Sequence, residues 1–130
     1  MNALDFSGRS VLVIGGSSGI GNGIAQAFRA QGAGVAVCGT RASAADYSAA
    51  DGCDLEGLDY QQLDVSNAAV IDVFAPGLDR LDVLVLAQGA VLYRRGEFAM
   101  DGFRKVVEVN LISLMACATK FHTLLREAKG

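Results

Sequence analysis

Apolar residues fall into short continuous runs, separated by segments in which they recur at helical spacing. Continuous runs occupy residues 11–14 and 35–38, and residues 58–63 and 81–86 are two further strand-like segments that include polar residues. Short apolar runs bounded by glycine or other turn residues are typical of strands buried in a sheet. The pattern therefore predicts four strands.

The segments between the runs predict helices. Ile20, Ile24 and Phe28 recur at helical spacing after the first run. Ser66 is the expected N-cap of a helix over residues 67–75, and residues 100–128 contain no proline and predict one long helix. Residues 40–50 predict a loop with one helical turn. Strands alternating with helices predict an α/β fold with a parallel sheet and right-handed crossovers.

The long segment 100–128 carries more apolar residues than one sheet-facing stripe needs. We expect one stripe, widened by Val106, Val109, Ile112 and Met115, so that the helix is buried on two sides. The expected stripe comprises Phe103, Val107, Leu111, Leu114, Ala118, Phe121 and Leu125.

A glycine-rich turn joins the first strand to the first helix. It holds Gly15, Gly16, Gly19 and Gly21. A strand, a tight turn and a helix in this order direct the free N–H groups of the helix start toward the strand's carboxyl end, where a phosphate binds well. The alternative is a purely structural turn, and the flanking strand and helix favour phosphate binding.

Composition narrows the class of protein. The chain has 130 residues, of which 52% are hydrophobic and 19% charged, with a net charge of −3. We expect one domain with a real core. Lysine and arginine are scattered, which argues against a nucleic-acid or anionic-membrane partner. No apolar run has membrane-spanning length, and the early Asp5 argues against a secretion signal. Three cysteines without metal spacing suit a reducing compartment, so we expect a cytoplasmic protein.

The segment Gly15-Gly16-Ser17-Ser18-Gly19-Ile20-Gly21 resembles the nucleotide loop of the short-chain dehydrogenases/reductases, which use NAD or NADP. The chain resembles about the first half of that family's domain. The resemblance implies a truncated, Rossmann-like doubly wound sheet of strand order 3-2-1-4, forming one dinucleotide-binding half-domain over residues 1–130. It also implies hydride transfer between nicotinamide and a carbonyl or alcohol substrate.

The resemblance assigns further cofactor-binding residues. Asp64 and Val65 stand where the family places an acid and a small apolar residue against adenine. Leu86-Ala87-Gln88-Gly89 stands where the family has Asn-Asn-Ala-Gly, so Gln88 and Gly89 are expected at the cofactor. Ile14 replaces the family's threonine before the first glycine. These departures remove side-chain hydrogen bonds that brace the cofactor loop.

Asn110 is the candidate catalytic residue. By resemblance it is the asparagine of the catalytic tetrad, which holds a water in a proton relay. From its place on the apolar stripe alone, it is a buried amide that must find partners. The alternative is a structural asparagine that pairs with nearby backbone at a helix irregularity.

The end of the second strand lies about 20 residues after the glycine turn, where a dinucleotide fold reads the adenosine ribose. Here the chain has Thr40 and Arg41 and no carboxylate. An arginine suits the 2′-phosphate of NADP, so NADP is favoured over NAD. An exposed loop arginine without a ligand is the alternative.

The family's Tyr-x-x-x-Lys pair is absent. Tyr47, Tyr60 and Tyr93 are followed four residues later by acidic residues. We therefore expect this chain to be inactive by itself. An unpaired apolar strand 81–86 and the helix 100–128 also predict a homo-oligomer. The alternative function is a non-catalytic nucleotide-binding or self-assembling half-Rossmann module.

Overall fold

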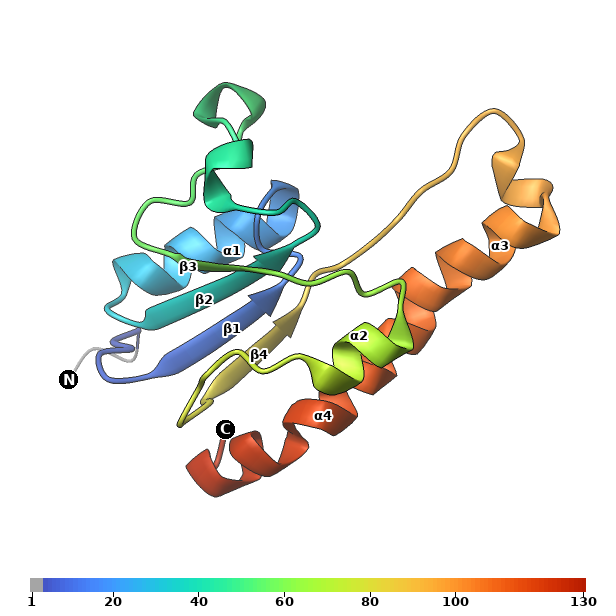
Figure 1. The fold of residues 1–130 in the computed structure, drawn as a ribbon. Helices are drawn as coiled ribbons and strands as arrows, with labels where there is room; N and C mark the ends of the chain where they lie inside the picture. Colours follow the sequence, from blue (N-terminus) through green and yellow to red (C-terminus); the bar gives the residue numbers. More distant parts are fainter. Residues whose placement is uncertain (1–3) are drawn as a thin grey trace.

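A four-stranded parallel sheet forms the centre of the molecule. The structure is a computed structural model, and it describes residues 4–130. The strands lie in the order β3-β2-β1-β4, which confirms the predicted fold class and strand order (Figure 1). Their bounds are β1 Ser10–Ile14, β2 Gly34–Gly39, β3 Asp59–Gln62 and β4 Val83–Leu86.

The two faces of the sheet bury two separate sets of side chains. Leu12, Ile14 and Cys38 point to one face, where helices α2 and α4 cover them. Val11, Val13 and Val37 point to the other face, which packs against α1. Because side chains alternate along a strand, a continuous apolar run fills both cores at once.

Strand register brings the carboxyl ends of the strands to one edge. Ile14 is paired with Cys38 of β2 and with Leu86 of β4. The chain leaves β1 between these two neighbours, so the order of connection reverses there. In open α/β sheets, this switch point is where ligands bind.

The helices are α1 Gly19–Ala30, α2 Ala68–Val73, α3 Met100–Val107 and α4 Ser113–Ala128. Short 3₁₀ turns cover Ala44–Asp46, Ala49–Asp51 and Gly96–Phe98, so the predicted loop contains two turns instead of one. None of the helices in the described part of the chain is long and apolar enough to cross a membrane.

The predicted cap of α2 is wrong by one residue. Asn67 is the N-cap, and its side-chain oxygen accepts from the backbone N–H groups of Ala69 at 3.0 Å and Val70 at 3.4 Å. The Ser66 hydroxyl instead donates to Asp64 at 2.6 Å. Asp64 therefore diverts Ser66 from capping, and the next residue takes that role.

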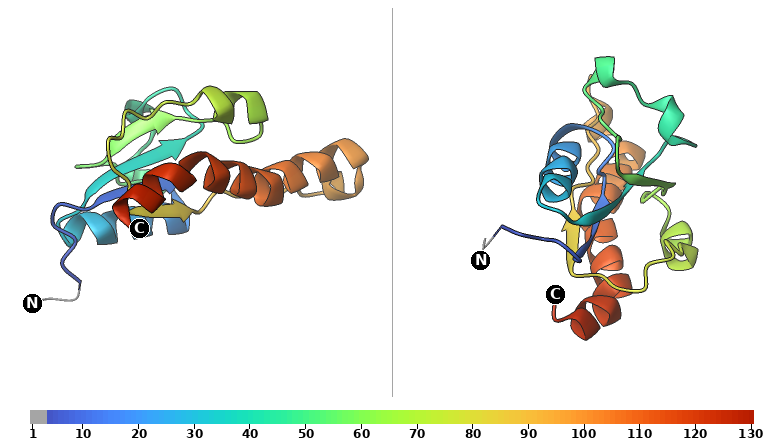
Figure 2. Two further views of the ribbon diagram at one scale, coloured as in Figure 1. Left: turned by 90° about the horizontal axis from the view of Figure 1, so that it is seen from below. Right: turned by 90° about the vertical axis from the view of Figure 1, so that its left-hand side faces the viewer.

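The predicted long helix is interrupted. A π-helical segment, Glu108–Ile112, separates α3 from α4. The backbone N–H of Ser113 bonds the carbonyl of Glu108, five residues back. Figure 2 shows α3 projecting beyond the sheet, while α4 lies against it.

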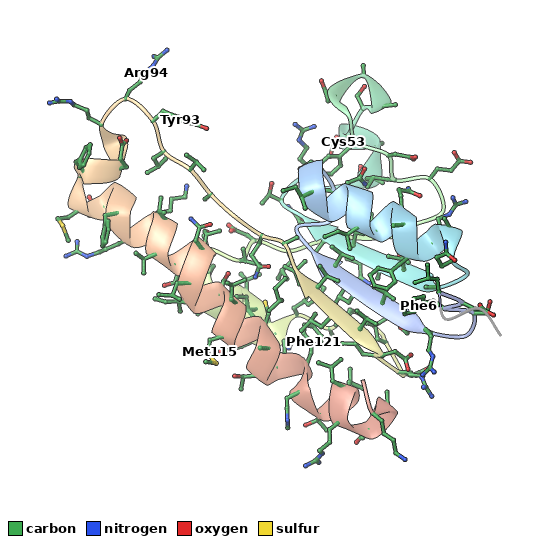
Figure 3. All side chains as sticks on the ribbon, turned by 180° about the vertical axis from the view of Figure 1, so that it is seen from behind. Phe6, Cys53, Tyr93, Arg94, Met115 and Phe121 are labelled. Atoms are coloured by element: carbon green, nitrogen blue, oxygen red, sulfur yellow. The ribbon has the colours of Figure 1, made fainter. Side chains whose placement is uncertain are left out.

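The π-helical segment changes which face of the helix is buried. The side chains turned to the core are Val109, Ser113, Cys117 and Phe121, each four residues after the last. Phe103 and Leu111, expected on the buried stripe, are 52% and 65% exposed. Figure 3 shows Phe121 lying between α4 and the sheet and Met115 pointing away. The extra residue of a π turn rotates the later side chains, so a stripe of uninterrupted 3.6-residue period is wrong here.

Candidate functional site

A cleft of about 590 Å³ opens at the carboxyl ends of the strands. Five segments line it: the glycine-rich turn, the end of β2, the segment after β3, the end of β4, and the last helices at Lys105 and Val109. The structure thus brings together eleven of the twelve residues predicted at the cofactor. These are Gly15, Ser17, Ser18, Gly19, Ile20, Gly21, Thr40, Asp64, Val65, Gln88 and Gly89.

The glycine-rich turn folds tightly against its own backbone. Gly15 has φ +76°, and its N–H and that of Gly16 donate to the carbonyl of Cys38 at 3.0 and 3.1 Å. A Cβ at Gly21 would collide with the carbonyl of Gly15. Only glycine therefore allows the start of α1 to approach the end of β1 so closely.

The start of α1 leaves N–H groups facing this cleft. Ser18 is the N-cap, but its side chain makes no capping hydrogen bond. Gly19 has φ +56° and no heavy atom within 4 Å of the place where a Cβ would stand. The first N–H groups of a helix have no partner inside it. Uncapped N–H groups, the helix dipole and open space together suit a phosphate.

Asp64 is held as a carboxylate at the far wall. Its Oδ1 accepts from the Ser66 hydroxyl at 2.6 Å and the Ser66 N–H at 3.0 Å. These bonds, with a smaller contribution from the charge of Lys105, keep the pKa of Asp64 below its usual range. Ser66 and Lys105 line the cleft as well. Neither was expected there, since only the fold brings α3 to β3.

Arg41 is the predicted cofactor residue that does not line the cleft. Its guanidinium donates to the carbonyl of Asp46 and lies 4.8 Å from the ring centre of Tyr47. Thr40, its neighbour, does line the cleft, and its carbonyl accepts from Gln62 at 2.9 Å. Arg41 therefore lies beside the rim of the cleft.

Gln88 links the end of β4 to α4. Its Nε2 donates to the Ser113 hydroxyl at 3.2 Å, and this hydroxyl donates to the carbonyl of Val109 at 2.6 Å. The side chain of Ser113 thus bonds the carbonyl that its own N–H bypasses in the π-helical segment. The residues around Ser113 in the sequence gave no signal of this contact, because Gln88 lies 25 residues earlier in the chain.

Asn110 is exposed, so the expectation of a buried amide is wrong. Its Oδ1 accepts from the N–H of Ala90 at 2.9 Å, and its Nδ2 donates to the carbonyl of Ala90 at 2.7 Å. It lies in the π-helical segment. The alternative of an asparagine paired with backbone at a helix irregularity describes these contacts. Because Ala90 lines the cleft, Asn110 stands just behind its wall.

A sequence model of the short chain dehydrogenase family matches residues 9–130. The chain belongs to this family. The predicted membership of the short-chain dehydrogenase/reductase family is thereby confirmed.

Known oxidoreductases are similar to this chain in sequence, and solved structures of short-chain dehydrogenases are similar to it in fold. A rhamnolipid-biosynthesis 3-oxoacyl-[acyl-carrier-protein] reductase of Pseudomonas aeruginosa is 32% identical, over 94% of this chain and 50% of its own. A 2-dehydro-3-deoxy-L-rhamnonate dehydrogenase (NAD(+)) of Sphingomonas is 30% identical, over 86% of this chain and 46% of its own. The chain thus spans about half the length of these relatives.

A structure titled as the Pseudomonas aeruginosa RhlG/NADP active-site complex superposes with a TM-score of 0.72. It is 30% identical and covers 98% of this chain and 52% of its own. A short-chain type dehydrogenase/reductase from Mycobacterium ulcerans, 24% identical, superposes with a TM-score of 0.74 over 97% of this chain and 50% of its own. The second likeness bears on the fold alone.

Proposed function

We propose that the chain is the cofactor-binding part of an NAD(P)-dependent oxidoreductase, and that its cleft binds NADP in preference to NAD. The bound cofactor would exchange a hydride with a carbonyl or alcohol substrate. One observation carries the proposal: uncapped N–H groups at the start of α1 face a cleft in which Gly19 has open space around it.

The residues present fit a dinucleotide. The backbone of the turn from Gly15 to Gly21 would hold the pyrophosphate, because its N–H groups and the helix dipole favour negative charge. Asp64 is a carboxylate beside Val65, and it would accept a hydrogen bond from the adenine amino group. These two residues support the adenine end of the cleft.

NADP is favoured over NAD by the rim beside Thr40. Arg41 supplies a guanidinium there, and no carboxylate of the described residues lines the cleft at the end of β2. One similar structure is titled as an NADP complex, whereas one relative is named for NAD(+). We therefore rest the preference for NADP on the residues of this chain.

We further propose that this chain alone does not catalyse hydride transfer. Tyr47 and Tyr60 are hydrogen-bonded to each other at 3.0 Å, and Tyr93 lies exposed at the tip beyond α3 (Figure 3). None of them is followed by a lysine four residues later. In this proposal Asn110 is the catalytic residue that these 130 residues contribute.

Calorimetric titration with ADP, NAD and NADP tests the proposal. We expect saturable binding of all three, tightest for NADP. Gly21→Ala should abolish it, because the added Cβ collides with the Gly15 carbonyl. Gly23→Ala is the matched control, since the same helix leaves 4 Å of free space there. No binding by a folded wild-type chain would contradict the proposal.

A self-assembling nucleotide-binding module without chemistry is the second candidate. It is favoured by the exposed apolar side chains of the last helices, including Leu111 and Met115. All four residues of β4 are also half-buried, whereas the neighbouring β1 is buried from Val11 to Ile14. A homo-oligomer through residues 81–86, residues 100–128 or both would cover these surfaces.

A further inference from the structure

Tyr47 lies where three segments of the cleft wall meet. Its hydroxyl accepts from the backbone N–H of Arg41 at 3.2 Å and stands 3.0 Å from the hydroxyl of Tyr60. The hydroxyl of Ser17, in the glycine-rich turn, lies nearby, since a Cβ at Gly39 would meet both hydroxyls. The Tyr47 hydroxyl thus joins the end of β2 to strand β3 beside that turn.

The direction of each bond follows from the number of protons. Tyr60 donates its only hydroxyl proton to the carbonyl of Arg41. The bond between the tyrosines must then run from Tyr47 to Tyr60. The network therefore runs from the Arg41 N–H through the hydroxyls of Tyr47 and Tyr60 back to the Arg41 carbonyl.

The pKa values of the two tyrosines shift in opposite directions. Burial raises the pKa of Tyr47, but hydrogen bonding at its hydroxyl and the charge of Arg41 outweigh burial and lower it. Burial and the neighbouring Tyr47 raise the pKa of Tyr60. The hydroxyl of Tyr60 therefore stays protonated at neutral pH and keeps its proton for the Arg41 carbonyl.

The ring of Tyr47 also supports the Arg41 side chain. The guanidinium lies 4.8 Å from the ring centre, and one of its nitrogens donates to the carbonyl of Asp46. A guanidinium has five N–H groups, and its other donors make no hydrogen bond within residues 4–130. A charged group with free donors is thus held over the Tyr47 ring, and Thr40, the residue before Arg41 in the chain, lines the cleft.

Tyr47 also takes the space that an acidic side chain would need. A Cβ at Gly39 would collide with the hydroxyls of Tyr47 and Ser17. Gly39 stands about 20 residues after the glycine-rich turn, where an acid reads the ribose 2′-hydroxyl in NAD-binding folds. The network therefore leaves no room for that acid at this position.

We propose that Tyr47 is a positioning residue that sets the preference of this site for a ribose carrying a 2′-phosphate. The hydroxyl of Tyr47 holds the backbone of Arg41, and the ring of Tyr47 holds the Arg41 guanidinium, at the rim of the cleft. This inference rests on the proposed cofactor binding and deepens it. Tyr47 need not touch the ligand itself.

The test compares two probes that differ only in the 2′-phosphate: adenosine 2′,5′-bisphosphate and adenosine 5′-monophosphate. The wild-type chain should bind the bisphosphate about tenfold more tightly, since a hydrogen-bonded charge pair contributes that much. Arg41→Met and Tyr47→Leu should each bring the two affinities to within about threefold of each other. Tyr47→Phe, which keeps the ring, should fall between. Tyr93→Leu is the control, and it should leave the ratio unchanged.

The ratio separates positioning from general loosening, because a merely destabilised site weakens both probes alike. In the double variant Arg41→Met with Tyr47→Leu, the ratio should equal that of Arg41→Met alone. The inference would be overturned if the two substitutions lowered the affinity ratio additively. It would also be overturned if folded Tyr47→Leu still bound the bisphosphate more tightly than the monophosphate. Equal binding of both probes by the wild type would overturn it too, yet leave nucleotide binding intact. Binding of neither probe would overturn the cofactor proposal itself. Circular dichroism checks the folding of each variant.

Discussion

The side chain of Asn110 forms a two-bond pair with the backbone of Ala90. Its oxygen accepts from the Ala90 N–H at 2.9 Å, and its nitrogen donates to the Ala90 carbonyl at 2.7 Å. The pair ties the π-helical segment to the chain leaving β4, where the cleft ends. Position and hydrogen bonding of Asn110 are thus fixed by one residue 20 positions earlier.

Asn110→Asp should destabilise the chain at neutral pH. The new carboxylate still accepts from the Ala90 N–H, but it sets a negative oxygen against the Ala90 carbonyl in place of a donor. We expect a loss of about 1–2 kcal/mol in the free energy of unfolding, measured in urea. Because folding raises the pKa of such a carboxyl, stability should return as pH falls and a proton restores the donor.

Thr119→Ala is the control for this variant, since Thr119 is exposed on α4 and makes no side-chain hydrogen bond within residues 4–130. Its stability should follow that of the wild type across the same pH range. An Asn110→Asp chain that becomes still less stable in acid would contradict the assigned role of the Ala90 carbonyl.

The sequence predicts the sheet well, because each of its runs is a local signal. The register of the last helix could not be predicted in this way. No proline or glycine marks residues 108–112, and the π-helical segment depends on Ser113, whose hydroxyl bonds Val109 and receives a bond from the distant Gln88. A single added residue then exposes Leu111 and buries Val109.

Ser113→Ala should weaken the join between α3 and α4. Ser113 is fully buried, so the variant leaves the carbonyl of Val109 and the amide of Gln88 without their shared partner. We expect a loss of about 1–3 kcal/mol, measured by urea unfolding. Ser113→Cys, of similar shape but a weaker donor, should lose less. Equal stability of Ser113→Ala and the wild type would show that the hydroxyl does not support the π turn.

The candidate site likewise has one part that could be predicted from the sequence and another that could not. The glycine-rich turn could be predicted because all its parts lie within seven residues. The place of Arg41 could not, because it depends on Tyr47 and on Tyr60, which belongs to another strand. Lys105 reaches the cleft only through the position of α3.

Asp82 should make the fold sensitive to acid. Its side chain is 5% exposed and accepts from Arg80, from the N–H of Ser10 at 2.9 Å and from Arg9 at 3.2 Å. The bonds from Arg80, opposed by burial and helped by Ser10 and Arg9, hold its pKa well below the usual 3.8. A lowered folded pKa gives stability that is fully present at neutral pH and is lost as pH falls below about 4.

Asp82→Asn should therefore be less stable at pH 7 by about 1.5 kcal/mol. This value is at the low end of the range for hydrogen bonds to charged groups, because both arginines are half exposed. Its stability should also fall less steeply than that of the wild type below pH 4. Asp101→Asn is the control, because the ion pair of Asp101 with Arg104 is fully exposed on the carboxylate side. Parallel pH profiles for Asp82→Asn and the wild type would show that Asp82 is not the group titrating.

The exposed apolar face of the last helices should drive self-association. Leu111 and Met115 are 65% and 71% exposed and lie one turn apart, so they form a continuous surface. Replacing both with glutamate places like charges at that contact and should shift the chain toward monomer by at least about tenfold in dissociation constant. Sedimentation velocity over a range of concentrations measures the shift. Val73→Glu is the control, because Val73 is 79% exposed on α2 instead. A wild-type chain that stays monomeric at every concentration would contradict the prediction. An oligomer unaffected by the double replacement would instead point to the half-buried strand β4.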